Sequence, residues 1–132
     1  NSLSLTALAF FMVIFFWTPP HFWALAIKYK DDYSAAGIPM LPVVATKARV
    51  HKEMWFHTIL MIACSIWLII SAGLAMWSMV VTVLLGLVFA RELLALKEGS
   101  EIYGKTAAKI FQWSITYLSL LSVVLVAAQL SA

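Results

Sequence analysis

Charged residues along this chain fall into two clusters that separate three apolar runs. Residues 1–27, 54–90 and 110–132 contain no Lys, Arg, Asp or Glu. A helix that spans a bilayer needs about 20 consecutive apolar residues. The first and last runs therefore each predict one spanning helix, at about residues 3–27 and 109–130.

The middle apolar run is too long for one crossing. As a single helix it would extend roughly 55 Å, against a hydrocarbon core of about 30 Å. We therefore expect a helical hairpin that breaks at Ser71-Ala72-Gly73, because glycine commonly ends helices. This predicts spans at 54–71 and 74–90, and hence an all-α, polytopic membrane helical bundle with four transmembrane helices.

Four crossings place the two charged segments, 28–53 and 91–108, on the same side of the membrane. The chain's nine Lys and Arg residues lie in or directly beside these segments. By the positive-inside rule, this side is expected to be cytoplasmic.

The composition agrees with a membrane protein. Hydrophobic residues make up 64% of the 132 residues and charged residues 11%, with a mean hydropathy of +0.96. A soluble globule of this length has too little interior for so much apolar surface, which excludes a free-standing soluble domain, a disordered tail and a nucleic-acid-binding module. The single cysteine, Cys64, excludes a disulfide framework. Because the chain starts at Asn1 with no basic flank, we expect it to be a piece of a longer membrane protein.

The first span has unusual polar features. Pro19-Pro20 predicts that the helix kinks or restarts, with Thr18 capping the new segment. The prolines indicate either a packing kink or the wall of a cavity. His21 at membrane depth is either a functional group or a histidine hydrogen-bonded to a carbonyl that the prolines free.

If this helix continues to Asp32, one of its faces carries His21, Lys28 and Asp32, with Trp17 nearby. Such a face would suit a ligand with an apolar body in the bilayer and a charged end at the interface. The alternative is an ordinary pattern of interfacial snorkelling side chains.

Asp31-Asp32 places two carboxylates beside the membrane, among the cations Lys28, Lys30, Lys47, Arg49 and Lys52. Mg²⁺ commonly takes one or two protein carboxylates together with substrate phosphates, so this cluster predicts a site for a metal-bound diphosphate. A solvated acidic pair at a helix end is the alternative. The apolar loop 37–44 is expected to pack over the cavity as a lid.

Four segments together resemble the protohaem IX farnesyltransferase (haem O synthase) family of intramembrane aromatic prenyltransferases. They are WTPPHFWALAI at 17–27, KDDY at 30–33, AGIPMLPVV at 36–44 and AAKIFQWSITYLSLL at 107–121. The resemblance implies a nine-helix membrane bundle, of which this chain would supply about the last four helices.

The resemblance also implies an activity, in which farnesyl diphosphate and haem b, as substrates, give haem O and pyrophosphate with the help of Mg²⁺. Asp31-Asp32 corresponds to the second of the family's two aspartate-containing motifs, and the first would lie in the N-terminal half of the same protein. Without that half, the isolated segment is expected to be inactive. The second motif departs from the DxxxD of quinone-making relatives. Four residues after Asp32, where that pattern has an aspartate, this chain has Ala36.

By this resemblance, Asp31 and Asp32 would hold Mg²⁺ through the diphosphate and act in catalysis with Lys28. The substrate-binding residues would be Lys30, Arg49, Trp17, His21 and Tyr29. Aromatic rings, including Phe22 and Trp23, would shield the allylic cation, and His21 would contact the haem iron or a propionate. Arg91, Lys105 and Lys109 would either add to the positive field or serve only as topology anchors.

Two other functions are compatible with the sequence: a related prenyltransferase with a quinone-precursor acceptor, and a non-enzymatic transporter or subunit fragment. Compatible locations are the bacterial plasma membrane and the mitochondrial inner membrane. Expected partners are the lipid bilayer and, through the resemblance, haem A synthase or oxidase assembly factors, but no nucleic acid.

Overall fold

The computed structural model describes residues 2–97 and 101–130, and this part of the chain contains only helices and the turns that join them. The predicted all-α class is confirmed. Four helices are long and apolar enough to cross a membrane. They are α1 (Ser2–Lys28), α4 (Lys47–Ala72), α5 (Met76–Leu94) and α6 (Tyr103–Leu130), with the short α2 (Lys30–Ala35) and α3 (Leu41–Val44) between α1 and α4.

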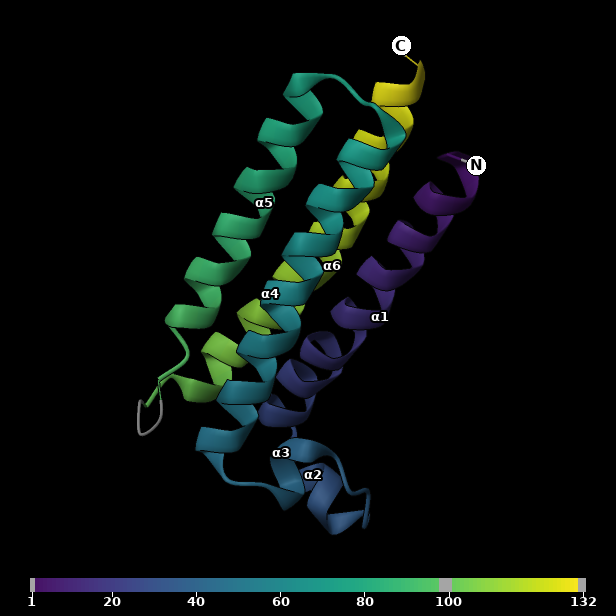
Figure 1. Ribbon diagram of the computed structural model, residues 1–132. Coiled ribbons are helices and arrows are strands. Elements are labelled where there is room, and N and C mark those ends of the chain that lie inside the picture. The colour runs from purple at the N-terminus through teal and green to yellow at the C-terminus, as the bar shows by residue number, and fades with distance from the viewer. Residues whose placement is uncertain (1, 98–100, 131–132) are drawn as a thin grey trace.

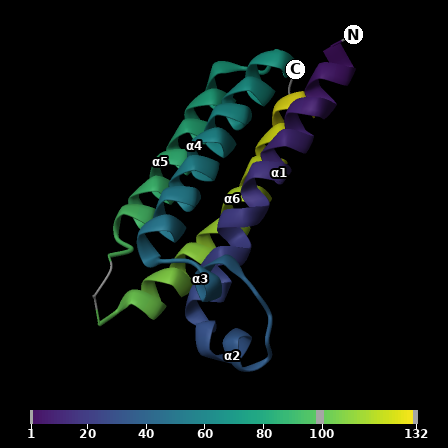
Figure 2. The same cartoon turned by 60° about the horizontal axis from the view of Figure 1, so that its bottom comes forward.

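The long helices run alternately up and down in one bundle (Figure 1). Helix α1 packs against α4 and α6, and α5 packs against the same two helices. Both chain ends lie at one end of the bundle, whereas α2, α3 and the α5–α6 connection lie at the other (Figures 1 and 2). The two charged segments therefore share one end, as the pattern of apolar runs predicts.

The predicted hairpin between the middle spans is confirmed. Helix α4 ends at Ala72, and Gly73 adopts the left-handed conformation with φ 65° and ψ 33°. The N–H of Leu74 donates to the carbonyl of Ile69, which satisfies one of the last carbonyls of the helix.

Other helix ends extend beyond the charge-free runs. Helix α4 begins at Lys47 rather than near 54, because the Thr46 hydroxyl accepts a hydrogen bond from the N–H of Arg49 and caps the helix there. Helix α5 continues to Leu94 and α6 begins at Tyr103. Residues 98–100 of the predicted loop 91–108 lie outside the described residues.

The two prolines do not restart α1, which continues through them to Lys28. The predicted capping role of Thr18 is wrong, because its hydroxyl instead donates to the carbonyl of Ile14 at 2.7 Å. This bond to the preceding turn ties Thr18 into the helix on the N-terminal side of the prolines.

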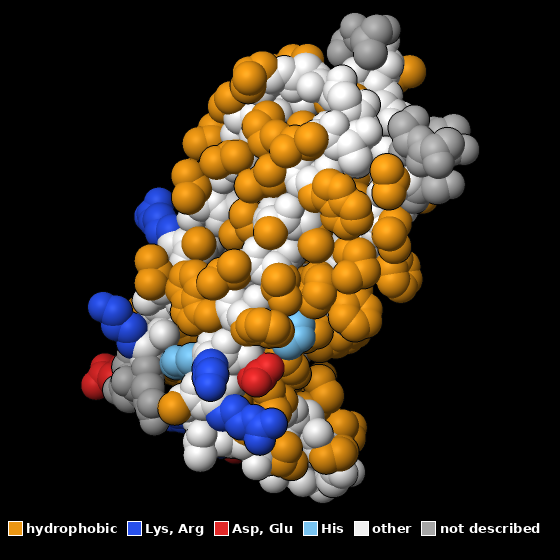
Figure 3. Space-filling view, in the orientation of Figure 1, with side chains coloured by type: hydrophobic (Ala, Val, Ile, Leu, Met, Phe, Trp, Pro, Cys, Tyr) orange, Lys and Arg blue, Asp and Glu red, His pale blue; other side chains and the backbone are white. Residues whose placement is uncertain are grey.

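Small and polar residues line several contacts between the helices. The hydroxyls of Ser65 on α4 and Tyr117 on α6 share a buried hydrogen bond of 2.7 Å. A side chain on Gly86 of α5 would meet Ile62 of α4 at 3.2 Å, so glycine permits this close approach. Apolar side chains cover much of the outer surface, and charged ones gather toward one end (Figure 3).

Candidate functional site

A pocket of about 390 Å³ lies at the charged end of the bundle. Five helices, α1, α2, α3, α4 and α6, and the α1–α2 junction contribute to its wall. The lining residues are Ile27, Lys28, Tyr29, Lys30, Asp31, Asp32, Pro42, Lys47, Val50 and Tyr103. Five residues that the sequence predicts for the site, at positions 28–32, therefore come together.

A break between α1 and α2 shapes this pocket. The backbone leaves the helical conformation at Tyr29, with φ −109° and ψ 31°, and α2 begins at Lys30. The condition for a shared face from His21 to Asp32, one helix that continues to Asp32, is therefore not met. Because the chain turns here, the Asp31-Asp32 pair follows the pocket wall rather than the face of α1.

The pocket carries both signs of charge. Its lining contains three lysines and two aspartates, which leaves one excess positive charge. Two of the lysines lie against tyrosine rings: Lys28 Nζ is 5.2 Å from the ring centroid of Tyr29, and Lys47 Nζ is 5.0 Å from that of Tyr103. An ammonium over a ring face is attracted by the π electrons, so these rings restrain both cations.

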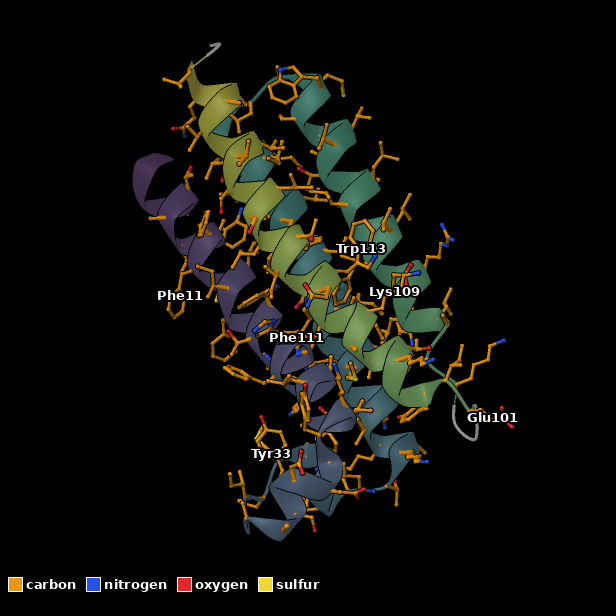
Figure 4. The ribbon with its side chains drawn as sticks, turned by 180° about the vertical axis from the view of Figure 1, so that it is seen from behind. Phe11, Tyr33, Glu101, Lys109, Phe111 and Trp113 are labelled. Atoms are coloured by element: carbon orange, nitrogen blue, oxygen red, sulfur yellow. The ribbon has the colours of Figure 1, made fainter. Side chains whose placement is uncertain are left out.

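Three predicted residues lie outside the pocket lining. Arg49 is exposed on α4, while Trp17 and His21 lie farther along α1 and contact α6. The indole N–H of Trp17 donates to the carbonyl of Ser114 at 2.8 Å. The imidazole of His21 stacks between the rings of Trp17 and Phe111, at centroid distances of 4.3 and 4.6 Å. Phe111 lies between α6 and α1 in Figure 4.

A hydrogen bond to α6 orients the imidazole of His21. Nδ1 lies 2.6 Å from the hydroxyl of Ser114, and that hydroxyl donates to the carbonyl of Phe111 at 2.5 Å. Because the single hydroxyl proton goes to Phe111, Ser114 accepts from an Nδ1–H of His21. When the ring is neutral, Nε2 then carries the lone pair. The partner of His21 is thus a serine hydroxyl rather than a freed carbonyl.

A second hollow, which is apolar and has a volume of about 490 Å³, lies between α1, α2 and the loop that follows α2. It is lined by Thr18, Pro19, Phe22, Trp23, Tyr33 and Met40. The loop 37–44 contributes Met40 to this hollow and Pro42 to the charged pocket. The loop therefore forms part of the wall of both, and its role as a lid stays a prediction.

The cations of the second charged segment lie elsewhere. Lys109 forms an ion pair with Glu92 at 3.3 Å, and the Glu92 side chain is only 7% exposed. Lys105 lines a separate depression beside this pair. Lys105 and Lys109 therefore lie between α5 and α6, outside the lining of the charged pocket. Arg91 is exposed on α5 and also lies outside that lining. The structure thus gives no support for a contribution of these three cations to the positive field of the pocket.

Sequence reasoning missed Tyr103 and His51. Tyr103 lines the pocket, and its hydroxyl shares a hydrogen bond of 2.7 Å with Nε2 of His51. These residues are 52 positions apart and form no motif. The one signal in the sequence is that Lys47 and His51 stand four residues apart at the start of α4, on one helix face.

These features define a polytopic membrane protein with a mixed-charge pocket and an apolar hollow at one end of its bundle. The sequence profile of the UbiA prenyltransferase family matches residues 1–116. The chain therefore belongs to the UbiA prenyltransferase family, which confirms the prenyltransferase resemblance that segments 17–44 and 107–121 carry.

Several curated relatives bear the name protoheme IX farnesyltransferase. The protein from Parafrankia sp. (strain EAN1pec) is 47% identical over 94% of this chain and 40% of its own length. The protein from Nostoc sp. (strain PCC 7120) is 39% identical over 92% of this chain and 38% of its own length. The protein from Chloroflexus aurantiacus is 38% identical over 98% of this chain and 22% of its own length. The chain thus spans two fifths or less of these relatives. No solved structure matches it.

Proposed function

We propose that the full-length protein transfers a farnesyl group from farnesyl diphosphate to a vinyl group of haem b, which leads to haem O. The observation that carries this proposal is the charged pocket next to an apolar hollow, both sharing α2. A prenyl diphosphate has the same two-part character, a polyanionic head on an apolar chain. The names of the relatives favour haem as the acceptor.

The charge of the pocket suits a metal-bound diphosphate. A prenyl diphosphate carries about three negative charges near neutral pH, since the second pKa of a phosphate is about 6. One divalent cation reduces this charge to about one negative unit, which the single excess positive charge of the lining offsets.

The acidic pair fits a metal that is shared with substrate. The described residues contain no cluster of three or more His, Cys, Asp or Glu that would hold a metal alone. Mg²⁺ accepts one or two carboxylates when phosphate oxygens and water complete its shell, so Asp31 and Asp32 would hold it together with the diphosphate. When bound, the metal would supply positive charge to the diphosphate oxygens.

The lysines of the pocket, Lys28, Lys30 and Lys47, would stabilise the pyrophosphate as it departs. The bond between the allylic carbon and oxygen breaks, and that carbon bonds to the terminal carbon of the vinyl group. The positive charge left on the other vinyl carbon is quenched by water, which releases a proton. The apolar hollow would hold the prenyl chain, and aromatic rings such as Tyr29, Phe22 and Trp23 would stabilise the cationic carbon.

His21 would bind the acceptor. Its Nε2 lone pair is of the kind that ligates haem iron, and its stacked ring is held in place by Trp17 and Phe111. Arg49, which directly precedes the pocket residue Val50 on α4 but is exposed, would contribute only to the surrounding positive field.

The proposal is tested by Asp32→Ala in the full-length protein. We expect haem O in the membranes to fall at least about a hundredfold, because an aspartate that touches the metal and diphosphate would be lost. Glu101→Ala is the matched control, since Glu101 is an exposed carboxylate at the same end but outside the pocket. Normal haem O in Asp32→Ala would contradict the assigned role.

Acceptor choice needs a separate measurement. Membranes are supplied with radiolabelled farnesyl diphosphate and either haem b or an aromatic quinone precursor. The proposal expects label in haem only, whereas label in the aromatic acid would indicate the related prenyltransferase. No product with either acceptor, and no thermal stabilisation by Mg²⁺ with a non-hydrolysable diphosphate analogue, would favour a non-enzymatic role.

A further inference from the structure

Tyr103 is held at two points by one face of α4. Lys47 and His51 are one helical turn apart, so their side chains lie on the same side of the helix. Lys47 Nζ lies 5.0 Å from the centroid of the Tyr103 ring. His51 Nε2 lies 2.7 Å from the Tyr103 hydroxyl. We call these three residues the Tyr103 cluster.

The Tyr103 cluster joins the two charged segments of the chain at the wall of the pocket. Lys47 and His51 belong to the first segment and Tyr103, the first residue of α6, to the second. Both Lys47 and Tyr103 line the pocket, and His51 does not. His51 contacts the pocket through Tyr103, with which it shares a hydrogen bond.

We infer that Tyr103 and His51 are positioning residues that hold the Lys47 ammonium ready for the diphosphate. This inference rests on the proposed function. Lys47 ends a flexible stem whose rotamer freedom must be lost when it binds an anion. A cation that a ring already restrains loses less freedom on binding, so the substrate binds more tightly.

A comparison with Lys28 supports the inference that Lys47 binds the diphosphate while Tyr103 and His51 hold it in position. Lys28 also lies over a tyrosine ring, that of the adjacent Tyr29, and the chain itself keeps this pair together. Lys47 and Tyr103 come from different helices, so their contact requires that the start of α6 stays beside α4. The hydrogen bond between His51 and Tyr103 is one such link between α4 and α6.

The first test measures steady-state kinetics of the full-length protein in membranes. Lys47→Ala is expected to raise KM for farnesyl diphosphate about tenfold, the size of one charge-assisted contact, with a smaller change in kcat. Tyr103→Leu and His51→Ala should raise KM in the same direction by about threefold to tenfold. Inhibition by inorganic pyrophosphate should weaken in parallel, and the affinity for haem should stay unchanged.

Two double variants distinguish a positioning role of Tyr103 and His51 from a general effect on packing. Tyr103→Phe keeps the ring and loses the hydroxyl, so it should match His51→Ala, and the double variant should be no worse than either alone. In the Lys47→Ala background, Tyr103→Leu should have no additional effect on KM. Lys105→Ala is the control for loss of a cation at this end of the bundle, because Lys105 lies outside the pocket.

The outcomes distinguish this inference from the proposed function. If the His51 and Tyr103 variants, including His51→Gln and Tyr103→Phe, lower only the amount of folded protein and leave KM unchanged, the inference is overturned. An unchanged KM in Lys47→Ala overturns it too. If the unmodified protein neither turns over farnesyl diphosphate nor binds pyrophosphate, it is the proposed function that fails.

Discussion

His21 combines a structural and a proposed binding role, and the residues around it allow these roles to be separated. Its ring stacks on Trp17 and Phe111, and its Nδ1 bonds to Ser114. The lone pair on Nε2 follows from the direction of the Ser114 hydrogen bond. Stability should therefore depend on the ring and on Nδ1, and haem ligation on Nε2.

We expect His21→Ala to lower the free energy of unfolding by about 2 kcal/mol, from two ring contacts and one hydrogen bond. Ser114→Ala keeps the rings and should cost about 1 kcal/mol. Thermal unfolding in detergent measures both. The absorption spectrum of bound haem should lose its histidine-ligand signature in His21→Ala and keep it in Ser114→Ala. If haem binding and turnover are unchanged in His21→Ala, His21 is purely structural.

At the scale of secondary-structure elements, the turn between α4 and α5 depends on the conformation of one glycine. Gly73 has φ +65°, and a Cβ there would have no atom within 4 Å. Steric crowding by neighbours is therefore not the constraint at this position. The left-handed backbone is the constraint, because an L side chain disfavours it.

Gly73→Ala should consequently destabilise the protein by about 1 kcal/mol. Gly104→Ala is the matched control, since Gly104 in α6 also has open space around it but lacks a positive φ. There alanine should stabilise the helix, by up to about 1 kcal/mol. Thermal midpoints of the two variants that shift in the same direction would refute this explanation of the turn.

At the scale of the whole molecule, the charged end of the bundle predicts the orientation of the protein in the membrane. We propose that the pocket opens on the cytoplasmic side of a bacterial plasma membrane, because the lysines and arginines gather at that end. Single cysteines test this arrangement after Cys64→Ala. Suitable positions are Ser34 on α2, Glu101 before α6 and Ala75 in the α4–α5 turn, all of which are exposed.

A membrane-impermeant maleimide should label Ser34→Cys and Glu101→Cys in inverted vesicles only, and Ala75→Cys in right-side-out vesicles only. The reason is that α2 and the start of α6 share one end of the bundle, opposite the Gly73 turn (Figure 1). Labelling of positions 34 and 101 from opposite sides would contradict the four-helix topology and the pocket with it. Labelling of both from the outside would contradict only the proposed orientation.

The sequence by itself determined the number of long helices, the hairpin at Gly73, the shared end of the charged segments and the grouping of Lys28–Asp32. These features depend on local properties: the length of an apolar run, the conformational freedom of glycine and the proximity of neighbours along the chain. No tertiary contact was needed to predict them. The family resemblance likewise rested on short contiguous segments.

Only the tertiary structure decided which distant side chains meet. It separated His21 from Asp32 by the break at Tyr29, paired Lys109 with Glu92, and brought Tyr103 to the pocket beside Lys47. The physical reason is that each of these contacts depends on how one helix is rotated and positioned against another. That geometry results from packing across the whole bundle, and no single segment encodes it.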